Sequence, residues 1–328
     1  MELNSMKKAV ITGIFGQDGS YLCEILSKFG YEIYGISHQN LSQNSQNIKK
    51  YLETKAIYPK IYTCDLNDYE YLKNILLEIC PDEIYHLAAM HVSSQSSIDE
   101  KYLYERNVMA THNILSINYM HLKNTKIITA GSCLMFDNSK TNFQNEQTKF
   151  NSKSLYGIAK ISEYLLVKHY RQMGLFAAMA IFYNHESSRR SEEFVTKKII
   201  SNMVKIANRN IKKFTLGNLN IKKDWGYARD YAYGMYLMSQ TQKPKDYIFS
   251  SNELHTIKEL VEICAQNLNI PNWQNHINID SNIISRKING QLFGNSSKAR
   301  QDLGWKNTLD FKDMIKLMID NEIKGDLK

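Results

Sequence analysis

A tyrosine and a lysine four residues apart, Tyr156 and Lys160, form the pair of side chains with the clearest chemical use. This spacing places both side chains on one face of a helix, about one turn apart. A phenol normally loses its proton at about pH 10. A nearby ammonium stabilises the phenolate and lowers the pKa of the phenol. Such a group can accept the proton of an alcohol while hydride leaves the same carbon, so the pair predicts redox chemistry at a hydroxyl-bearing carbon.

A glycine-rich turn near the start of the chain predicts a dinucleotide site. It reads T-G-I-F-G-Q-D-G, with glycines at positions 13, 16 and 19, between a predicted strand at 8–12 and a predicted helix at 20–29. Glycines at this spacing let the backbone approach a pyrophosphate, and the helix that follows directs its first amides at the same charge. The strand, turn and helix are the context that this pattern requires, so we expect a nicotinamide dinucleotide to bind here.

The predicted cofactor-binding residues lie in this turn, at the carboxyl ends of strands, or on the catalytic helix: Gly13, Gly16, Gln17, Asp18, Gly19, His38, Asp65, Leu66, Ala88, Ala89, Tyr156 and Lys160. The second strand ends in Ser37, His38 and Gln39. An acid at this point would bind the ribose of NAD, and an arginine would bind the extra phosphate of NADP. Since the phosphate ligands are missing, we favour NAD, with NADP as the alternative. Asp65 could accept a hydrogen bond from the adenine amine.

Ser132 completes the predicted catalytic trio with Tyr156 and Lys160. It comes just after a predicted strand at 126–130, where a hydroxyl can polarise the reacting carbonyl. The alternative is that Ser132 only caps a turn.

Strands alternate with helices over the first half of the chain, at 8–12, 31–36, 60–63, 83–87, 126–130 and 176–182. This alternation predicts an α/β fold, a Rossmann-type doubly wound parallel sheet with ligands at the carboxyl ends of its strands. After residue 183 the pattern loosens. We therefore expect a dinucleotide-binding domain over 1–183 and a smaller C-terminal substrate-binding lobe over 184–328, with strands that can cross back.

Composition excludes several other classes of protein. The net charge of +8 comes from basic residues spread along the chain, in doublets at most in its densest runs, which argues against nucleic-acid binding. Five cysteines without a C-x-x-C pair argue against a zinc site and disulfides, and suit the cytoplasm. The start lacks the apolar stretch of a signal peptide, and no segment has the roughly 20 apolar residues that span a bilayer. We expect no bound metal.

Several longer motifs resemble the GDP-mannose 4,6-dehydratase family, over residues 7 to about 320. They are T-G-x-x-G-Q-D-G-S-Y-L at 12–22, H-L-A-A at 86–89, Y-x-x-x-K at 156–160, N-H-E-S-S-R-R at 184–190, F-V-T-K-K-I at 194–199, L-G-N-L at 216–219, K-D-W-G-Y-A-R-D at 223–230 and L-G-W at 303–305. The motifs at 184 and 223 are the most specific to this family. The resemblance implies an extended short-chain dehydrogenase/reductase that works in surface-polysaccharide synthesis.

The resemblance also implies a GDP-linked sugar bound between the lobes. The predicted substrate-binding residues are Asn184, Glu186, Thr196, Lys197, Lys223 and Arg286. Amide, hydroxyl and cationic donors suit a diphosphate, although the family generally carries arginine at the Lys223 position. The Arg189-Arg190 loop resembles one that reaches a neighbouring subunit's cofactor, so a homodimer or homotetramer is expected.

One departure from the family affects the chemistry most. Where the family has T-S-E-L-Y-G, this chain has S-C-L-M-F-D at 132–137, which places Leu134 at the catalytic glutamate. A shift of one residue would place Cys133 there, and no carboxylate lies between Thr129 and Phe136. Loss of a general acid-base typically costs about 100- to 10,000-fold in rate. The chain is therefore equipped for redox at C4 of the sugar and poorly equipped to eliminate water.

Four hypotheses follow. The first is hydride transfer at C4 of a GDP-hexose or GDP-heptose, by a 4-dehydrogenase or a 4-epimerase. The others are a 4-keto-sugar reductase, a 4,6-dehydratase that takes its acid from Glu186 or Asp137, and a catalytically idle GDP-sugar-binding protein.

Overall fold

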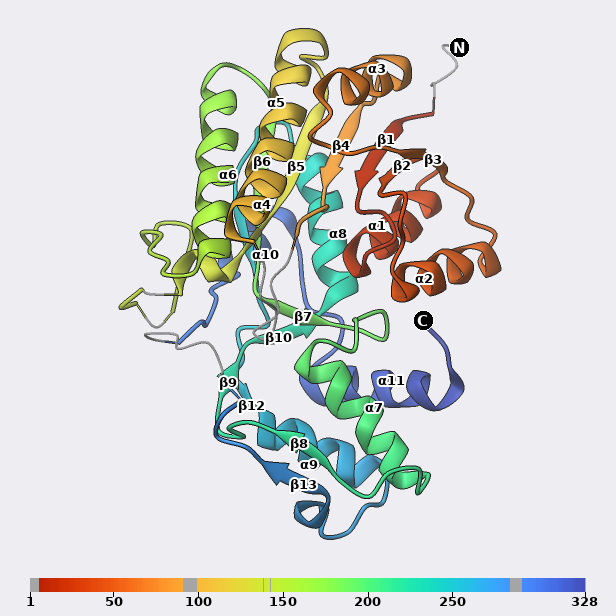
Figure 1. Ribbon diagram of the computed structural model, residues 1–328. Coiled ribbons are helices and arrows are strands. Elements are labelled where there is room, and N and C mark those ends of the chain that lie inside the picture. The colour runs from red at the N-terminus through yellow and green to blue at the C-terminus, as the bar shows by residue number, and fades with distance from the viewer. Residues whose placement is uncertain (1–5, 91–98, 138, 142, 284–290, 328) are drawn as a thin grey trace.

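A seven-stranded parallel sheet forms the centre of the larger part of the chain, in the order β11-β6-β5-β4-β1-β2-β3 (Figure 1). The computed structural model describes residues 6–90, 99–137, 139–141, 143–283 and 291–327. The strands are β1 (Lys8–Thr12), β2 (Glu32–Ser37), β3 (Lys60–Thr63), β4 (Glu83–His86), β5 (Lys126–Ser132), β6 (Ala177–Phe182) and β11 (Tyr247–Phe249). The expected doubly wound α/β fold is confirmed.

Both faces of the sheet are covered, because neighbouring residues of each strand point to opposite sides. In β1, Ala9 and Ile11 pack into one apolar cluster with Leu22 and Leu26, and Val10 packs into the other with Leu72. The helices of the dinucleotide half are α1 (Gln17–Lys28), α2 (Gln43–Thr54), α3 (Tyr69–Ile79), α4 (Glu100–Tyr104), α5 (Ala110–His121) and α6 (Leu155–Gln172), with a π-helical turn η1 (Glu105–Met109) and a 3-10 turn η2 (Cys133–Phe136).

Two of these helices are not as the sequence pattern suggests. The pattern over 99–122 predicts one long helix, but η1 divides it, and there the side-chain amide of Asn107 bonds the backbone of Met90. Helix α2 is not predicted by an apolar period, since only Ile48, Tyr51 and Leu52 of its 12 residues are buried.

The smaller lobe lies below the sheet in Figure 1, where α7, α9 and α11 pack together. The remaining elements are β7 (Asn184–Glu186), α7 (Val195–Ala207), β8 (Phe214–Leu216), β9 (Lys222–Lys223), β10 (Trp225–Tyr227), α8 (Ala228–Ser239), β12 (His255–Thr256), α9 (Ile257–Asn267), η3 (Trp273–His276), β13 (Ile277–Ile279), α10 (Ser297–Leu303) and α11 (Phe311–Lys324). Three pairs of short strands, β10-β7, β12-β9 and β13-β8, connect them.

Chain from the second half returns to the sheet. Strand β11 pairs in parallel with β6, and α8 packs against α1 on one face. Strand β11 is thus a strand of the second half that crosses back to the first. The division of the chain into two domains after residue 183 stays a prediction.

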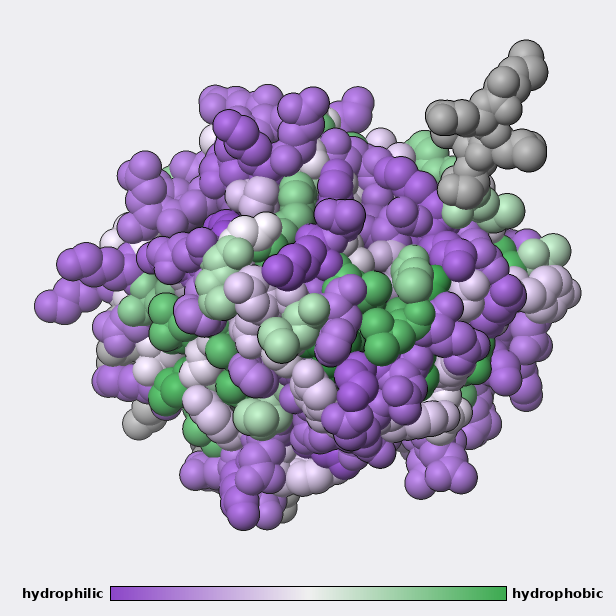
Figure 2. All heavy atoms as spheres, turned by 90° about the horizontal axis from the view of Figure 1, so that it is seen from above, coloured by the Kyte–Doolittle hydropathy of each residue, from purple (hydrophilic) through white to green (hydrophobic). Residues whose placement is uncertain are grey.

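The face seen from above in Figure 2 is mainly hydrophilic, with some hydrophobic side chains gathered near its middle. Within the described part of the chain, no helix combines the length and the apolar character needed to cross a bilayer.

The role of β11 in the core is testable with Ile248→Ala. Ile248 is 0% exposed and lies beside Ile181 of β6. Truncation of such a residue should lower the free energy of unfolding by about 2–5 kcal/mol, measured by urea denaturation. In the control Ile279→Ala, on an isoleucine of β13 that is 58% exposed, the change should stay within about 0.5 kcal/mol. Equal losses in both variants would contradict this placement of β11.

Candidate active site

The first two turns of α6 carry the predicted Tyr156 and Lys160. Ser154 caps the helix by accepting a hydrogen bond from the amide of Gly157 at 3.2 Å. Tyr156 is 7% exposed and Lys160 3% exposed, and the ammonium lies 5.9 Å from the centroid of the tyrosine ring. The spacing of four therefore brings the two side chains together beneath the surface, as the sequence predicts.

The end of β5 lies against this turn of α6. The Lys160 ammonium donates to the carbonyl of Ala130 at 3.0 Å. A Cβ at Gly157 would lie only 2.4 Å from the carbonyl oxygen of Leu134, so glycine is required for this close approach. Ser132, the last residue of β5, is therefore held beside the turn that carries Tyr156.

The Ser132 hydroxyl has a structural contact of its own. Its oxygen accepts a hydrogen bond from the amide of Leu134 at 3.2 Å and so caps η2. The alternative interpretation of Ser132 as a cap is thus correct, but it does not exclude the catalytic one. A hydroxyl that accepts one hydrogen bond keeps its own proton for donation, so Ser132 can still polarise a carbonyl.

A buried carboxylate that the sequence did not reveal lies beside Lys160. Glu163, three residues further along α6, accepts from the Lys160 ammonium at 2.9 Å and is 1% exposed. Burial lowers the pKa of Lys160, but the nearby Glu163 carboxylate and the Tyr156 phenol outweigh this effect and raise it above its usual value. Lys160 therefore stays charged in an enclosed position. The spacing of three between Lys160 and Glu163 was the only sign of this pair in the sequence, and such spacings are common on exposed helix surfaces.

The glycine-rich turn has the close packing that a bound pyrophosphate needs. A Cβ at Gly19 would lie 2.4 Å from the carbonyl oxygen of Gly13 and 2.9 Å from Cα of Ile14. The N-cap residue of α1 is Gly16, so no side chain caps the first amides of this helix. The glycine-rich turn therefore leaves these amides available to an anion, and it fits the phosphates of a dinucleotide.

Gln17 and Asp18, predicted to contact the cofactor, bind β7 in this structure. The carboxylate of Asp18 lies 3.0 Å from Nε2 of His185, and the Gln17 amide donates to the His185 carbonyl at 3.1 Å. Burial raises the pKa of Asp18, but His185 outweighs burial and holds it below the usual range. The pKa of His185 is raised, chiefly by Asp18 against the opposing effect of burial. This ion pair joins the dinucleotide turn to the second half of the chain.

An arginine from a distant part of the chain lies beside the end of β2. Arg106 of η1 approaches His38, with 3.5 Å between a guanidinium nitrogen and Nε2. The same nitrogen donates to the Asp65 carboxylate at 2.6 Å. Leu66 is held nearby, because its carbonyl accepts from Asn113 at 2.9 Å. No short motif signals Arg106, since it lies 68 residues from His38 along the chain.

The segment with Ala88 and Ala89 is fixed at both ends. The amide of Ala88 donates to Oγ1 of Thr12 at 3.1 Å. Met90 donates to and accepts from the side-chain amide of Asn107, at 2.7 and 3.1 Å. Both alanines are thereby held next to the glycine turn, and their contact with the cofactor stays a prediction.

Of the predicted substrate residues, Asn184 and Lys223 are neighbours. Asn184 begins β7 and donates to the carbonyl of Asp224 at 3.2 Å. Arg286 lies outside the described residues.

Three other predicted substrate residues are buried or paired inside the protein. Glu186 is 3% exposed and lies 3.4 Å from the Arg190 guanidinium. Thr196 is 0% exposed. Lys197 donates to Glu322 of α11 at 2.6 Å.

Arg189 makes its contacts inside its own chain. It is 1% exposed, donates to Ser20 at 3.0 Å and to the carbonyl of Leu327 at 2.8 Å, and forms an ion pair with Glu24 of α1. The expected reach to a neighbouring subunit's cofactor therefore has no support at Arg189, and the oligomeric state stays a prediction.

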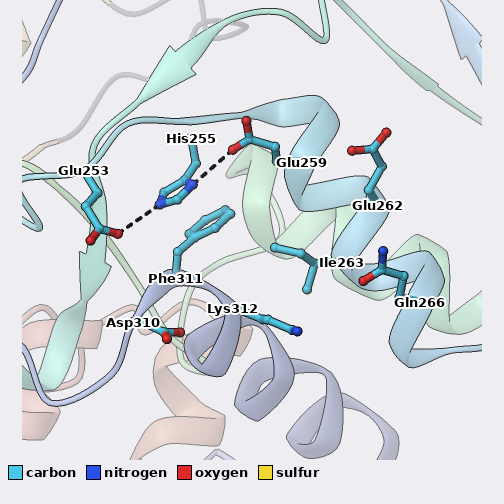
Figure 3. A pocket seen from close by; sticks show the side chains of 9 residues that line it. All are labelled: Glu253, His255, Glu259, Glu262, Ile263, Gln266, Asp310, Phe311 and Lys312. Carbon is cyan, nitrogen blue, oxygen red and sulfur yellow. Dashed lines mark hydrogen bonds and ion pairs between the residues drawn. The ribbon is translucent and has the colours of Figure 1, made fainter.

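A separate hollow of about 360 Å³ lies between α9 and α11 (Figure 3). His255 lies between Glu253 and Glu259, at 3.3 and 3.0 Å, and its ring stacks on Phe311 with 4.0 Å between centroids. None of the predicted site residues lines this hollow. Across the described residues, no group of three or more His, Cys, Asp and Glu side chains could hold a metal ion.

Comparison with known proteins places these observations in a family. The sequence profile described as GDP-mannose 4,6 dehydratase matches residues 10–318. GDP-mannose 4,6 dehydratase 1 of Arabidopsis thaliana is 36% identical over 331 residues, covering 97% of this chain and 90% of that protein. The GDP-mannose 4,6-dehydratase of Vibrio cholerae is 31% identical, covering 97% of this chain and 94% of that protein.

Solved structures with the same fold are more distant in sequence. UDP-glucuronic acid 4-epimerase of Bacillus cereus, in complex with UDP-glucuronic acid and NAD, superposes with a TM-score of 0.83 at 20% identity, covering 97% of this chain and 99% of that chain. The dTDP-glucose 4,6-dehydratase of Bacillus anthracis, in complex with NAD, gives 0.83 at 18% identity and covers 97% of each chain. At this identity the likeness shows the fold.

The glycine turn can be tested by Gly19→Ala. The added Cβ meets the backbone of Gly13, so the turn must open. Binding of NADH, followed by its fluorescence, should weaken by about tenfold or more. Lys28→Ala, at the exposed end of the same helix, should bind as the wild type does. Unchanged NADH binding by a folded Gly19→Ala protein would contradict this site for the pyrophosphate.

Proposed function

The chain belongs to the GDP-mannose 4,6-dehydratase family, and from this premise we propose that it is a nicotinamide-dependent enzyme acting at C4 of a GDP-linked hexose or heptose. The reaction is oxidation to a 4-keto sugar or, with re-reduction of the same carbon, C4 epimerisation. The observation that carries the proposal is the combination of a retained hydroxyl, phenol and ammonium around Lys160 with leucine at position 134.

The proposed step assigns one task to each residue. Tyr156 accepts the proton of the 4-hydroxyl while C4 loses a hydride, so the sugar loses two electrons and gains a carbonyl. Lys160 stabilises the phenolate, and Ser132 donates a hydrogen bond to the new carbonyl oxygen. A bound nicotinamide dinucleotide supplies the acceptor for the hydride and its electron pair. For epimerisation the same three residues return the proton after the hydride re-enters from the other face of the carbonyl.

Elimination lacks a base at the family's usual position. Leu134 is half-buried and packs against the apolar cluster between the sheet and α6. Cys133, the residue placed there by a shift of one position, is 4% exposed, and burial raises the pKa of its thiol to about 12. Neither side chain is ionised near neutral pH, so neither can take the proton from C5.

The two acids considered as substitutes already have other partners. The Asp137 carboxylate accepts from the amide of Lys153 at 2.8 Å. Glu186 lies beside the Arg190 guanidinium. These contacts support redox at C4 over the 4,6-dehydratase alternative.

NAD is the proposed cofactor. His38 directly follows β2, and the guanidinium of Arg106 beside it is paired with Asp65. The extra phosphate of NADP would lie near the Asp65 carboxylate and share its arginine, and the repulsion between the two anions favours NAD. The NADH binding titration, repeated with NADPH, decides between the two.

Product analysis tests the proposed function. The purified protein is incubated with GDP-mannose and a GDP-heptose, each with NAD, and the products are analysed by mass spectrometry and NMR. Loss of two hydrogen atoms, or an unchanged mass with an inverted C4, supports the proposal. Loss of one water would establish a 4,6-dehydratase instead. Reduction of a 4-keto substrate without any oxidation would establish a reductase, and binding without turnover an idle binding protein.

Removal of the phenol should stop the redox step. Tyr156→Phe keeps the ring and its packing but has no group that accepts the 4-hydroxyl proton, so turnover should fall about 100- to 10,000-fold while NADH binding persists. The control Tyr233→Phe, on a tyrosine of α8 that is 39% exposed, should retain full turnover. Wild-type turnover by Tyr156→Phe would remove this residue from the mechanism.

Leu134→Glu should introduce the missing reaction. Once C4 is a carbonyl, a carboxylate at this position can remove the proton from C5 and pass it to the C6 hydroxyl, which leaves as water. Return of the C4 hydride to C6 and of a proton to C5 would then give a 4-keto product that has lost one water, which mass spectrometry should detect. Leu134→Gln, which has the same shape without the charge, should form no such product. A folded and redox-active Leu134→Glu enzyme with unchanged products would contradict the assignment of position 134.

A further inference from the structure

Glu163 is a buried carboxylate that the proposed reaction does not use. Its side chain is 1% exposed and that of Lys160 is 4% exposed, so the ion pair between them lies almost entirely out of water. A carboxylate in such a position is costly unless other groups pair with it. The pairing with the proposed catalytic lysine therefore calls for an explanation in terms of that lysine.

Two groups hold the same carboxylate oxygen. Oε2 of Glu163 accepts from the Lys160 ammonium at 2.9 Å and from the hydroxyl of Thr111, on α5, at 3.1 Å. The other oxygen, Oε1, is buried without a hydrogen-bond partner among the described residues. The position of the carboxylate is thus set by α5 and Lys160 together.

A line of hydrogen bonds leads from Glu163 back to the dinucleotide turn. Nε2 of His86 lies 3.1 Å from Oγ1 of Thr111, and its Nδ1 lies 2.8 Å from Oγ1 of Thr12, the residue before Gly13. Thr12 already accepts from the amides of Leu87 and Ala88, so its proton points to Nδ1. His86 then donates from Nε2 to Thr111. The single proton of Thr111 has two acceptors at 3.1 Å, the carbonyl of Asn107 and the carboxylate of Glu163, and the charged oxygen is the stronger of the two.

Few other charges face the pair. Burial lowers the pKa of His86 on β4 to about 3, so this histidine is neutral. From α6 itself Tyr156 faces Lys160, and from α5 the facing polar group is the hydroxyl of Thr111, which does not titrate. Burial raises the pKa of the Glu163 carboxyl, although the Lys160 ammonium and the Thr111 hydroxyl favour its charged form. Among the described residues, this carboxyl is the acidic group in contact with the Lys160 ammonium.

We propose that Glu163 is a positioning residue that fixes the Lys160 ammonium and offsets its charge, so that Tyr156 holds its proton more firmly than it would beside an unpaired lysine. The proposal rests on the roles assigned above to Tyr156 and Lys160. Its consequence is a bias toward the protonated phenol, the form that returns a proton to the sugar oxygen when a 4-keto intermediate is reduced. A C4 epimerase needs that half of the reaction as much as the oxidation.

The phenol can be titrated without any substrate. The protein is labelled with ¹³C at Cζ of its tyrosines, and the Tyr156 signal is identified by its absence in Tyr156→Phe. Replacement of Glu163 by glutamine removes the charge at nearly constant shape. The midpoint of the Tyr156 titration should fall by about one pH unit, since an unbalanced ammonium favours the phenolate. An unchanged or higher midpoint would overturn the proposal.

Further variants separate charge from packing. Glu163→Ala also removes the charge and should lower the midpoint, so the test remains available if Glu163→Gln does not fold. Glu163→Asp keeps the charge and should stay near the wild-type midpoint. Glu262→Gln, on a glutamate of α9 whose side chain is 39% exposed, controls for loss of a distant charge and should change nothing. The proposed role would be contradicted if the titration midpoints of these variants changed in proportion to their melting temperatures and not according to the charge at position 163.

Turnover gives a second measurement that a purely structural role would not move. In Glu163→Gln, the acid limb of the pH profile of kcat/KM for C4 oxidation should shift to lower pH by the same amount, with little change in the KM of the sugar nucleotide. An acid limb that stays in place would overturn the proposal. A protein that is inert toward every GDP-sugar would refute the proposed function. The phenol titration, which needs no substrate, would still test the effect of Glu163 on Tyr156.

Discussion

The buried ammonium of Lys160 is the interaction on which the geometry of the site depends. A charge in this position must be paired, and its partners come from two elements: the carbonyl of Ala130 on β5, and Glu163 with the ring of Tyr156 on α6. The contact with Ala130 joins α6 to the sheet, and the two contacts within α6 hold the ammonium in place for it. Ser132 follows two residues after Ala130 and Tyr156 lies one turn before Lys160, so the same contacts position the hydroxyl and the phenol. The reactive groups are thus located by one charge whose burial would otherwise be unfavourable.

The contact between Gly157 and the carbonyl of Leu134 connects position 134 to the proposed catalytic pair. It holds the backbone at this position against the helix of Tyr156 and Lys160, where the leucine side chain packs against the apolar cluster beside α6. A carboxylate would add acid-base chemistry to the redox step, and leucine leaves the redox step alone. The second half of the chain is joined to α1, because His185 pairs with Asp18 and Arg189 with Glu24.

The local parts of this architecture could be predicted from sequence. The first and third strands, the glycine turn and the Tyr156-Lys160 spacing are each encoded in a short stretch of sequence, where the residue types and their spacing predict the structure. The contacts that were missed join distant parts of the chain: Arg106 to His38, and Asp18 to His185. A strand that crosses back to the sheet was expected, but the sequence did not identify β11 as that strand. Glu163 was missed for another reason, since a glutamate three residues from a lysine is ordinary on a solvated helix. Only burial, which the sequence does not state, makes the pair significant.

The fate of the hydrogen at C5 of the sugar tests the central claim most directly. The enzyme is incubated in deuterium oxide with NAD and a GDP-sugar that it oxidises at C4, and the product is examined by NMR. Because no ionised base stands at position 134, the account predicts that C5 keeps its original hydrogen through turnover. Deuterium at C5 or C6, introduced at the rate of turnover, would show that the site removes that proton and would contradict the account.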